Sequence, residues 1–439
     1  MTTIQGIEVF DVRFPTSVGS HGSDAMNAAP DYSATYVILR TDHPNGLEGH
    51  GLTFTIGRGN ELCVAAVKSL VPMVQGRELK DIVAGFGRYW RTLVGDSQLR
   101  WVGPEKGVIH LATAAIVNAL WDLWAKIEDK PVWKLLTDLT PEQLVNCLDF
   151  SSVNDFLTKG EALAILKGLY AGRQEREAYI RQHGYPAYTT SVGWLGYSED
   201  KIRRLCRQAV AGGWSNFKQK VGGDGAGDCR RAAIIREEIG EDARLMMDAN
   251  QVWGVDEAVA RVRNLAAFSP YWIEEPTHPD DILGHRVIRE RVDPVLVATG
   301  EQCHNSVMFK QFFQLQALDV CQVDSCRVGG LNEVLLILLM AAKADVPVCP
   351  HAGGVGLCEF VQHVSIFDYI AVSGTLDGRM TEYVDHLHEH FVDPVVIEQG
   401  CYRAPAKAGY SGQMHSAALE TYAFPGGSAW QAPSAGRQS

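Results

Sequence analysis

The chain has 439 residues, of which 46% are hydrophobic and 21% charged, a composition typical of a soluble globular protein of roughly two or three domains. Its formal net charge of -12 argues against binding to nucleic acid and against binding to an anionic membrane surface. We expect neither a secretory signal nor a membrane-spanning segment, and we expect the ten scattered cysteines to be free thiols of a cytoplasmic protein.

Residues 1–136 are predicted to form an α+β domain. Its strand candidates are residues 7–10 and 34–41, and its helix candidates are residues 61–74 and 107–128. Between the two strands lies a loop, residues 19–31, rich in Gly, Ser, Asp, Asn and Pro. A loop of this length is either a functional lid or a surface excursion. Residues 137–185 are helical and polar, and we interpret them as a connector or insertion.

From residue 186 to residue 385, short β-rich runs alternate with helical runs. The strand candidates are residues 187–190, 216–221, 244–247, 271–273, 295–298, 319–323, 346–349 and 369–372. The helix candidates include residues 198–211, 228–238, 255–267, 306–315 and 332–344. Eight strands in a repeated βα pattern predict a closed α/β barrel. An open doubly wound sheet is the alternative, but no G-x-G-x-x-G loop follows the first strand.

The final segment, residues 386–439, loses the βα rhythm and is rich in Pro, Gly and Ser towards its end. We expect it to pack back against the first domain and to fray at its terminus.

Two lysines lie on one face of the predicted strand at residues 216–221. Alternate side chains of a strand point the same way, so Lys218 and Lys220 share a face and Gln219 points away from it. Two neighbouring ammonium groups lower each other's pKa, and a lysine with a lowered pKa can act as a base near neutral pH. A pair of exposed surface lysines is the structural alternative.

Three carboxylates follow three successive predicted strands, at Asp248, Glu274 and Glu301, with spacings of about one βα unit. The carboxyl ends of barrel strands meet at one face, so these side chains are expected to converge. Such a group of anions is usually neutralised by a divalent metal, and all-oxygen ligation favours Mg²⁺. A single carboxylate at a strand end is more often a cap or a surface group.

Two further polar residues continue this series, with Asp324 after the next strand and His351 after the one that follows. A carboxylate on one strand end can orient an imidazole on its neighbour and favour its protonated form. A lone histidine is more often structural, but this one belongs to a regular series.

These motifs resemble the enolase superfamily, mandelate racemase subgroup, and within it the L-fuconate dehydratase family. The resemblance to the subgroup rests on Lys218-Gln219-Lys220, Asp248-Ala249-Asn250, Glu274-Glu275-Pro276, Gly300-Glu301, Asp324 and His351. The resemblance to L-fuconate dehydratase extends from about residue 8 to about residue 415. It includes residues 11–16, 22–26, 99–107, 185–190, 351–357 and 382–388.

The resemblance implies a (β/α)7β TIM-like barrel (residues 186–385) with an α+β N-terminal capping domain (1–136), a helical connector (137–185) and a C-terminal segment (386–439) that returns to the cap. It implies that Asp248, Glu274 and Glu301 bind Mg²⁺, that Lys220 is the base, and that Asp324 and His351 form a dyad. Lys218, Asn250, Glu382, Gly22, Ser23, Asp24 and Tyr32 would contact the substrate.

The implied reaction is the dehydration of an acid sugar, L-fuconate, to a 2-keto-3-deoxy acid. Lys220 would remove the C2 proton and His351 would protonate the departing C3 hydroxyl. The barrel residues leave open a dehydratase for another aldonate such as L-galactonate, a racemase, or a non-catalytic binding protein. An oligomer is expected from the resemblance alone.

Two positions depart from the family pattern. Gln219 stands where an apolar residue is expected between the lysines, and by strand parity it faces the helices, where it needs a hydrogen-bond partner. Residues 149–152 read Asp-Phe-Ser-Ser, where Arg-Tyr is usual after Asp-Phe. We expect a modest effect of Gln219 on stability and intact chemistry.

Overall fold

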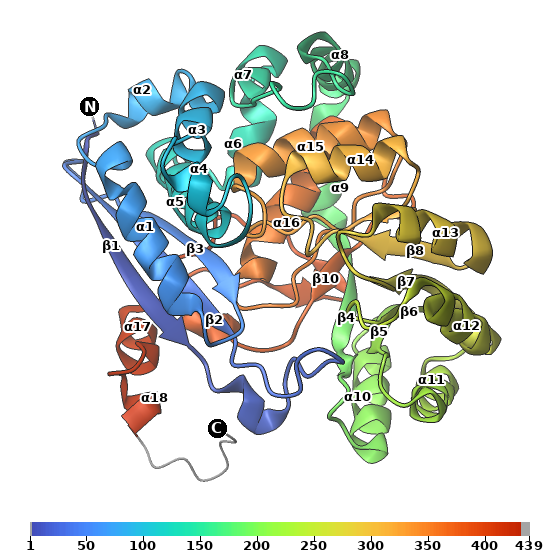
Figure 1. Ribbon diagram of the computed structural model, residues 1–439. Helices are drawn as coiled ribbons and strands as arrows, with labels where there is room; N and C mark the ends of the chain where they lie inside the picture. The colour runs from blue at the N-terminus through green and yellow to red at the C-terminus, as the bar shows by residue number, and fades with distance from the viewer. Residues whose placement is uncertain (1, 432–439) are drawn as a thin grey trace.

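An N-terminal α+β domain caps a C-terminal α/β barrel, as the sequence predicts (Figure 1). The structure is a computed structural model that describes residues 2–431.

The cap is a three-stranded antiparallel sheet covered by helices. The strands are β1 (Ile4–Arg13), β2 (Ser33–Thr41) and β3 (Gly49–Thr55), in that order. The helices are α1 (Asn60–Val74), α2 (Leu79–Val83), α3 (Phe86–Val94), α4 (Leu99–Val102) and α5 (Gly107–Ile127). Helix α5 packs closely on β3, since a Cβ at Gly51 would lie 2.2 Å from the Ala115 carbonyl oxygen. Glycine in β3 therefore permits this approach.

Helix α5 is also the one helix in residues 2–431 that is long and apolar enough to cross a membrane. The expectation of no membrane-spanning segment rested on finding no apolar stretch near that length, and α5 corrects this point. Of the most apolar 18-residue stretch of α5, 89% is buried inside the protein. This stretch contributes core residues such as Ile116 and Leu120.

Four helices connect the cap to the barrel. They are α6 (Val132–Asp138), α7 (Pro141–Asn146), α8 (Lys159–Tyr170) and α9 (Arg173–His183). Capping boxes at Thr140 with Gln143 and at Thr158 with Glu161 start α7 and α8. Asp149 lies just before Ser151 and Ser152, the positions that depart from the family pattern, and it pairs with Arg91 of the cap.

Parallel strands and helices then alternate to form the barrel. The strands are β4 (Tyr185–Gly193), β5 (Asn216–Lys220), β6 (Arg244–Asp248), β7 (Pro270–Glu274), β8 (Leu296–Thr299), β9 (Val320–Cys321) and β10 (Thr381–Tyr383). The helices are α10 (Glu199–Ala211), α11 (Gly225–Ile239), α12 (Val255–Leu265), α13 (Ile282–Val292), α14 (Ser306–Gln314), α15 (Leu331–Lys343) and α16 (Leu357–Phe367). Parallel pairing of β10 with β4 brings the last strand beside the first.

The seventh strand position is present only as two parallel bridges, Cys321 with Val348 and Asp324 with His351. The predicted eighth strand at residues 369–372 is wrong. These residues lie in the π-helical segment Asp368–Ser373 that continues α16, and β10 takes the eighth position instead. A short apolar run reads alike in a buried strand and in a buried helix, which explains the error.

Buried side chains fill the interior of the barrel in one layer. The layer consists of Tyr188, Met246, Trp272, Ala298, Val320, Cys349 and Met380. Strand β5 contributes Lys218, which pairs with Met246 of β6. A lysine therefore takes the place of β5 in a layer that is otherwise mainly apolar.

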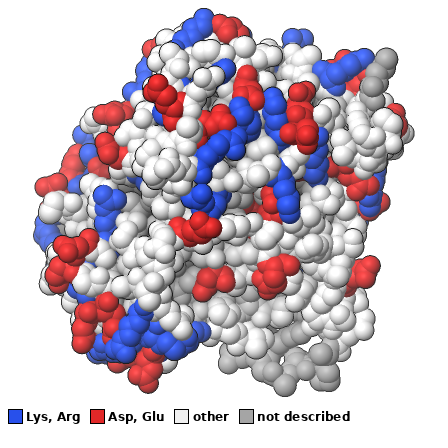
Figure 2. Space-filling view, turned by 180° about the vertical axis from the view of Figure 1, so that it is seen from behind, with Lys and Arg blue, Asp and Glu red and all other residues white. Residues whose placement is uncertain are grey.

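The C-terminal segment first extends the barrel and then reaches the cap. Strand β12 (Cys401–Tyr402) pairs with β4 and with β11 (Ile397–Glu398). Helices α17 (Ser416–Tyr422) and α18 (Ser428–Gln431) follow, and α17 lies beside β1, where Val12 bridges to Ala423 (Figure 1). The expected fraying concerns residues 432–439, which lie outside the described residues. Acidic and basic side chains are interspersed on the face seen from behind (Figure 2).

Candidate active site

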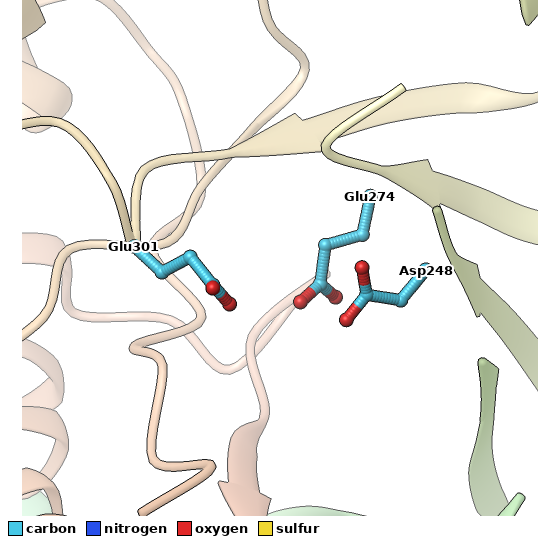
Figure 3. Close-up of side chains that lie close together, drawn as sticks. All are labelled: Asp248, Glu274 and Glu301. Atoms are coloured by element: carbon cyan, nitrogen blue, oxygen red, sulfur yellow. The ribbon is translucent and has the colours of Figure 1, made fainter. Parts of the chain in front are cut away.

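Three carboxylates converge at the carboxyl ends of neighbouring barrel strands. Asp248 ends β6, Glu274 ends β7, and Glu301 lies two residues beyond β8. One oxygen from each lies within 4.8 Å of the others, and all three residues are buried (Figure 3). The regular spacing in the sequence therefore reflects a cluster in space.

The electrostatics of the cluster suit a divalent cation. Burial and the adjacent Asp248 carboxylate raise the pKa of Glu274. Burial alone would raise the pKa of Asp248, but Lys220 and Lys218 lower it. Within residues 2–431, Glu301 Oε2 accepts no hydrogen bond, and it lies 3.3 Å from His351 Nε2. The three buried carboxylates form an all-oxygen donor set that fits Mg²⁺.

The two lysines of β5 point into the barrel, as parity predicts, but they occupy different environments. Lys218 Nζ lies 2.7 Å from Glu274 Oε1 and 2.7 Å from Glu382 Oε1, and the residue is fully buried. Lys220 Nζ lies 2.5 Å from Asp248 Oδ2.

The prediction that the lysine pKa is lowered is wrong, because these contacts raise it. Burial and Lys218 do lower the pKa of Lys220, but the carboxylates, Asp248 above all, outweigh them and raise it overall. The pKa of Lys218 is likewise raised by Glu274 and Glu382 against the effect of burial. The sequence showed the pair of like charges but not the stronger attraction from across the barrel.

The dyad forms at the sixth and seventh strand ends. His351 Nδ1 lies 2.7 Å from Asp324 Oδ2, while Asp324 Oδ1 accepts hydrogen bonds from the backbone N–H groups of Cys326 and Arg327, both at 2.7 Å. Asp324 is therefore fixed, and it orients the imidazole. Burial lowers the pKa of His351, but Glu301 and Asp324 raise it to about 9 overall.

A cavity of about 460 Å³ lies between cap and barrel. Of the residues predicted from the sequence, those that line it are Lys220, Asn250, Glu301, Asp324, His351, Gly22, Asp24 and Tyr32. Asp248 and Glu274 lie deeper, against the lysines. Asn250 presents a buried amide oxygen without a hydrogen-bond partner in the described part of the chain.

Three predicted substrate contacts are not part of this lining. Lys218 and Glu382 lie below it, and Glu382 Oε2 accepts a hydrogen bond from the Ala352 N–H at 2.8 Å. Ser23 instead joins the loop of residues 19–31 to the loop after β4. Its Oγ accepts a hydrogen bond from the Gly196 N–H at 3.0 Å, and its carbonyl accepts one from the Leu195 N–H at 3.1 Å.

The sequence reading missed several residues of the cavity wall. Trp194 directly follows β4, and Lys220 Nζ lies 5.5 Å from its ring centroid. Arg327 also lines the cavity and donates from Nε to the Glu301 carbonyl at 3.2 Å. Extending the search for strand-end residues to the first strand would have found Trp194. Arg327 lies three residues past Asp324, and spacing alone gives no signal for it.

Both regions of the chain match known families. Residues 21–137 match the family described as "Mandelate racemase / muconate lactonizing enzyme, N-terminal domain", and residues 201–418 match "Enolase C-terminal domain-like".

Individual proteins match over nearly the whole chain. The L-galactonate dehydratase of Hypocrea jecorina is 53% identical over 429 residues, which are 97% of this chain and 94% of that protein. The crystal structure of human mitochondrial enolase superfamily member 1 has a TM-score of 0.97 and 55% identity, and the match covers 98% of each chain. The L-talarate/galactarate dehydratase of Salmonella typhimurium LT2, liganded with Mg and L-lyxarohydroxamate, shares the fold with a TM-score of 0.75 at 24% identity. That match covers 95% of this chain and 92% of the dehydratase chain.

Proposed function

The chain belongs to the enolase superfamily, and from this premise we propose that it is a Mg²⁺-dependent acid-sugar dehydratase acting on a six-carbon aldonate, L-fuconate. The observation that carries the proposal is the meeting of Lys220, Glu301 and the Asp324–His351 dyad at one cavity. A base, an acid and a cluster of carboxylates around one space are the groups that a dehydration next to a carboxylate requires.

Asp248, Glu274 and Glu301 are the residues that would hold Mg²⁺, as their converging oxygen donors support. When bound there, Mg²⁺ would offset the carboxylate charges that act on Lys220 and would stabilise negative charge on the substrate carboxylate. Lys218 contributes a fixed positive charge beneath the same carboxylates.

Lys220 would take the proton from C2 of the sugar acid. Its amine reaches the cavity from the end of β5, with Trp194 beside it. On the other side, Asp324 holds His351 Nδ1, so that Nε2 can give a proton to the C3 hydroxyl. The C3–O bond breaks, water leaves, and the resulting enol becomes the 2-keto-3-deoxy acid.

The cap side of the cavity supports L-fuconate over L-galactonate. The two acids differ at C6, which is a methyl group in L-fuconate and a hydroxymethyl group in L-galactonate. The cap contributes apolar side chains to the wall, including Ile56, Leu62, Val108 and Leu111, and also polar ones, including Asp24, Asn27 and Arg58. The preference for L-fuconate rests on C6 meeting the apolar part of this wall. An apolar wall disfavours an added hydroxyl by at most about 100-fold, so both acids are expected to react, L-fuconate faster.

The experiment is a screen of six-carbon aldonates for 2-keto product, with Mg²⁺ and with a chelator. We expect turnover of L-fuconate and, more slowly, of L-galactonate, and loss of both with the chelator. Racemisation without a keto product would identify a racemase. The absence of turnover on every acid sugar would favour a binding protein.

Two variants separate the base from the acid. Lys220→Ala should lose C2 deuterium exchange together with turnover, because no other described amine lines the cavity at that strand end. His351→Asn should keep the exchange and lose dehydration. Full exchange in the Lys220 variant, or normal dehydration in the His351 variant, would contradict these roles.

We also propose a reducing compartment, the cytoplasm, for this protein. All ten cysteines are free thiols, eight of them buried, as a reducing compartment maintains them. Cell fractionation tests this proposal, and recovery from an oxidising compartment would exclude it.

A further inference from the structure

A buried polar cluster lies behind β5, on the side of the strand away from the cavity. Gln219, Asp228 and Arg231 are 0%, 3% and 9% exposed, and they fill the contact between β5 and the first turns of α11. Gln219 Nε2 donates to the Asp228 carbonyl at 3.0 Å, which is the partner that an outward-facing glutamine needs.

Arg231 and Asp228 of the cluster form hydrogen bonds with the backbone at Lys220 and Gly222. Arg231 Nη2 donates to the Lys220 carbonyl at 2.6 Å and to Asp228 Oδ1 at 2.8 Å. The second oxygen of Asp228 accepts from the Gly222 N–H at 3.0 Å. One turn of α11 thus fixes the peptide groups on both sides of Val221.

The turn after β5, which contains Gly222, is closely packed by its neighbours. Gly222 has a φ of 98°, and a Cβ there would lie 2.7 Å from the Val252 side chain and 3.0 Å from Cβ of Ala25, which belongs to the loop of residues 19–31. A displacement of this turn would therefore be passed to the end of β5. A misplacement of about 1 Å at a reacting group can cost on the order of 100-fold in rate.

Stability alone does not explain the cluster. Burial lowers the pKa of Arg231 despite its partner Asp228. Arg231 Nη1 and Gln219 Oε1 are both buried without a hydrogen-bond partner among the described residues. A buried charge with an unsatisfied nitrogen costs free energy, and apolar side chains would pack such a contact at lower cost.

We propose that Arg231, held in place by Asp228, is a positioning residue that sets where Lys220 presents its amine in the cavity. The proposal rests on the proposed function, in which Lys220 is the base. It names no new group in contact with substrate.

The test compares two buried members of the cluster. In Arg231→Met the guanidinium is lost, and we expect kcat and the C2 exchange rate to fall about 10- to 100-fold while KM stays within about 3-fold. Gln219→Leu is the matched control, since Gln219 is also buried but, within residues 2–431, its side chain donates to Asp228 and not to the Lys220 carbonyl. Its kcat should stay within about 2-fold. Arg231→Lys keeps a donor and should recover part of the loss.

Wild-type kcat in Arg231→Met would overturn the proposal, as would equal losses in the Arg231 and Gln219 variants. If Arg231→Met does not fold, Asp228→Asn, which keeps the shape but weakens the hold on Arg231, should show the same kcat loss. A crystal structure of the Arg231 variant gives an independent reading without turnover. The proposal requires the contact between Lys220 Nζ and Asp248 Oδ2 to be displaced, and an unchanged contact contradicts it even if no aldonate reacts.

Discussion

His363 of α16 is a fully buried side chain whose neutral form is fixed by its neighbours. The Trp133 N–H donates to its Nδ1 at 3.2 Å, and its Nε2 lies 3.0 Å from Ser411 Oγ, which itself donates to Asp393 Oδ2 at 2.9 Å. A second ring proton would have no acceptor at Nδ1. Burial accordingly lowers the pKa of His363 to about 3.

This lowered pKa predicts a loss of stability in acid. Unfolded His363 titrates near 6.5, so its full contribution is present above that pH and declines as the pH falls towards 3. At pH 5 the loss from this group should be about 2 kcal/mol. His363→Gln cannot take up a proton, so denaturant unfolding at pH 7.5 and pH 5 should show a smaller difference in the variant by that amount. An identical pH difference in both proteins would show that His363 already titrates normally in the fold.

At the residue scale, strand parity was sufficient to predict which side chains of β5 point into the barrel. It placed Lys218 and Lys220 inward and Gln219 outward, because the period of two is fixed by strand geometry. The pKa of the lysines could not be predicted, since it depends on Asp248, Glu274 and Glu382, whose distances are set by the barrel as a whole. The Ser23 contact with Gly196 likewise depends on tertiary structure.

Among the elements, the turn between β5 and α11 has little room for an added side chain. Gly222→Ala combines a left-handed backbone with contacts to Val252 and Ala25, so it should cost more than strain alone. Gly46→Ala is the control, because Gly46 has a φ of 64° with no atom within 4 Å of an added Cβ. We expect about 1 kcal/mol of destabilisation for the control and about 3 kcal/mol for Gly222→Ala, which should also lower kcat. If the two variants are equally destabilised in thermal or denaturant unfolding, the turn at Gly222 accommodates a Cβ by a small shift.

The elements that sequence reasoning located well are those with a clear amphipathic or β-rich pattern and flanking signals. Helix α14 begins at Ser306 after the N-cap Asn305, close to the predicted start. The last two strands of the barrel were harder to predict from the sequence. The seventh is reduced to single bridges, and β10 has three residues, too few for a periodic pattern. Glu382 was accordingly found by resemblance and not by its place at a strand end.

For the molecule as a whole, a buried hydrogen-bonded pair joins cap to barrel. His110 of α5 lies with Nε2 2.6 Å from Glu333 Oε2 of α15, and Glu333 also accepts from the N–H groups of Ser306 and Gly329, both at 2.7 Å. Glu333→Gln should cost about 2 kcal/mol, because the amide replaces one of two acceptor oxygens with an NH2 group that faces buried donors. Lys343→Met, which breaks an exposed pair with Glu161, should cost less than about 1 kcal/mol. If the two variants lose similar free energies of unfolding in denaturant, the buried pair does not hold the two domains together.

The hold of the barrel on Ser23 affects the timing of catalysis in the proposed function. Both hydrogen bonds from the loop after β4 are made by protein atoms alone, and Tyr197 of the same loop adds a contact to His21 at 2.9 Å. These contacts hold one side of the cavity in place, while Ile56 and Leu62 of its wall are 40% and 56% exposed. A sugar acid would therefore enter along this exposed edge while the Ser23 contacts hold, and its association rate would not wait for the loop to open. Because Gly22 and Asp24 are already held beside the cavity, we expect closure of this loop not to be the slowest step.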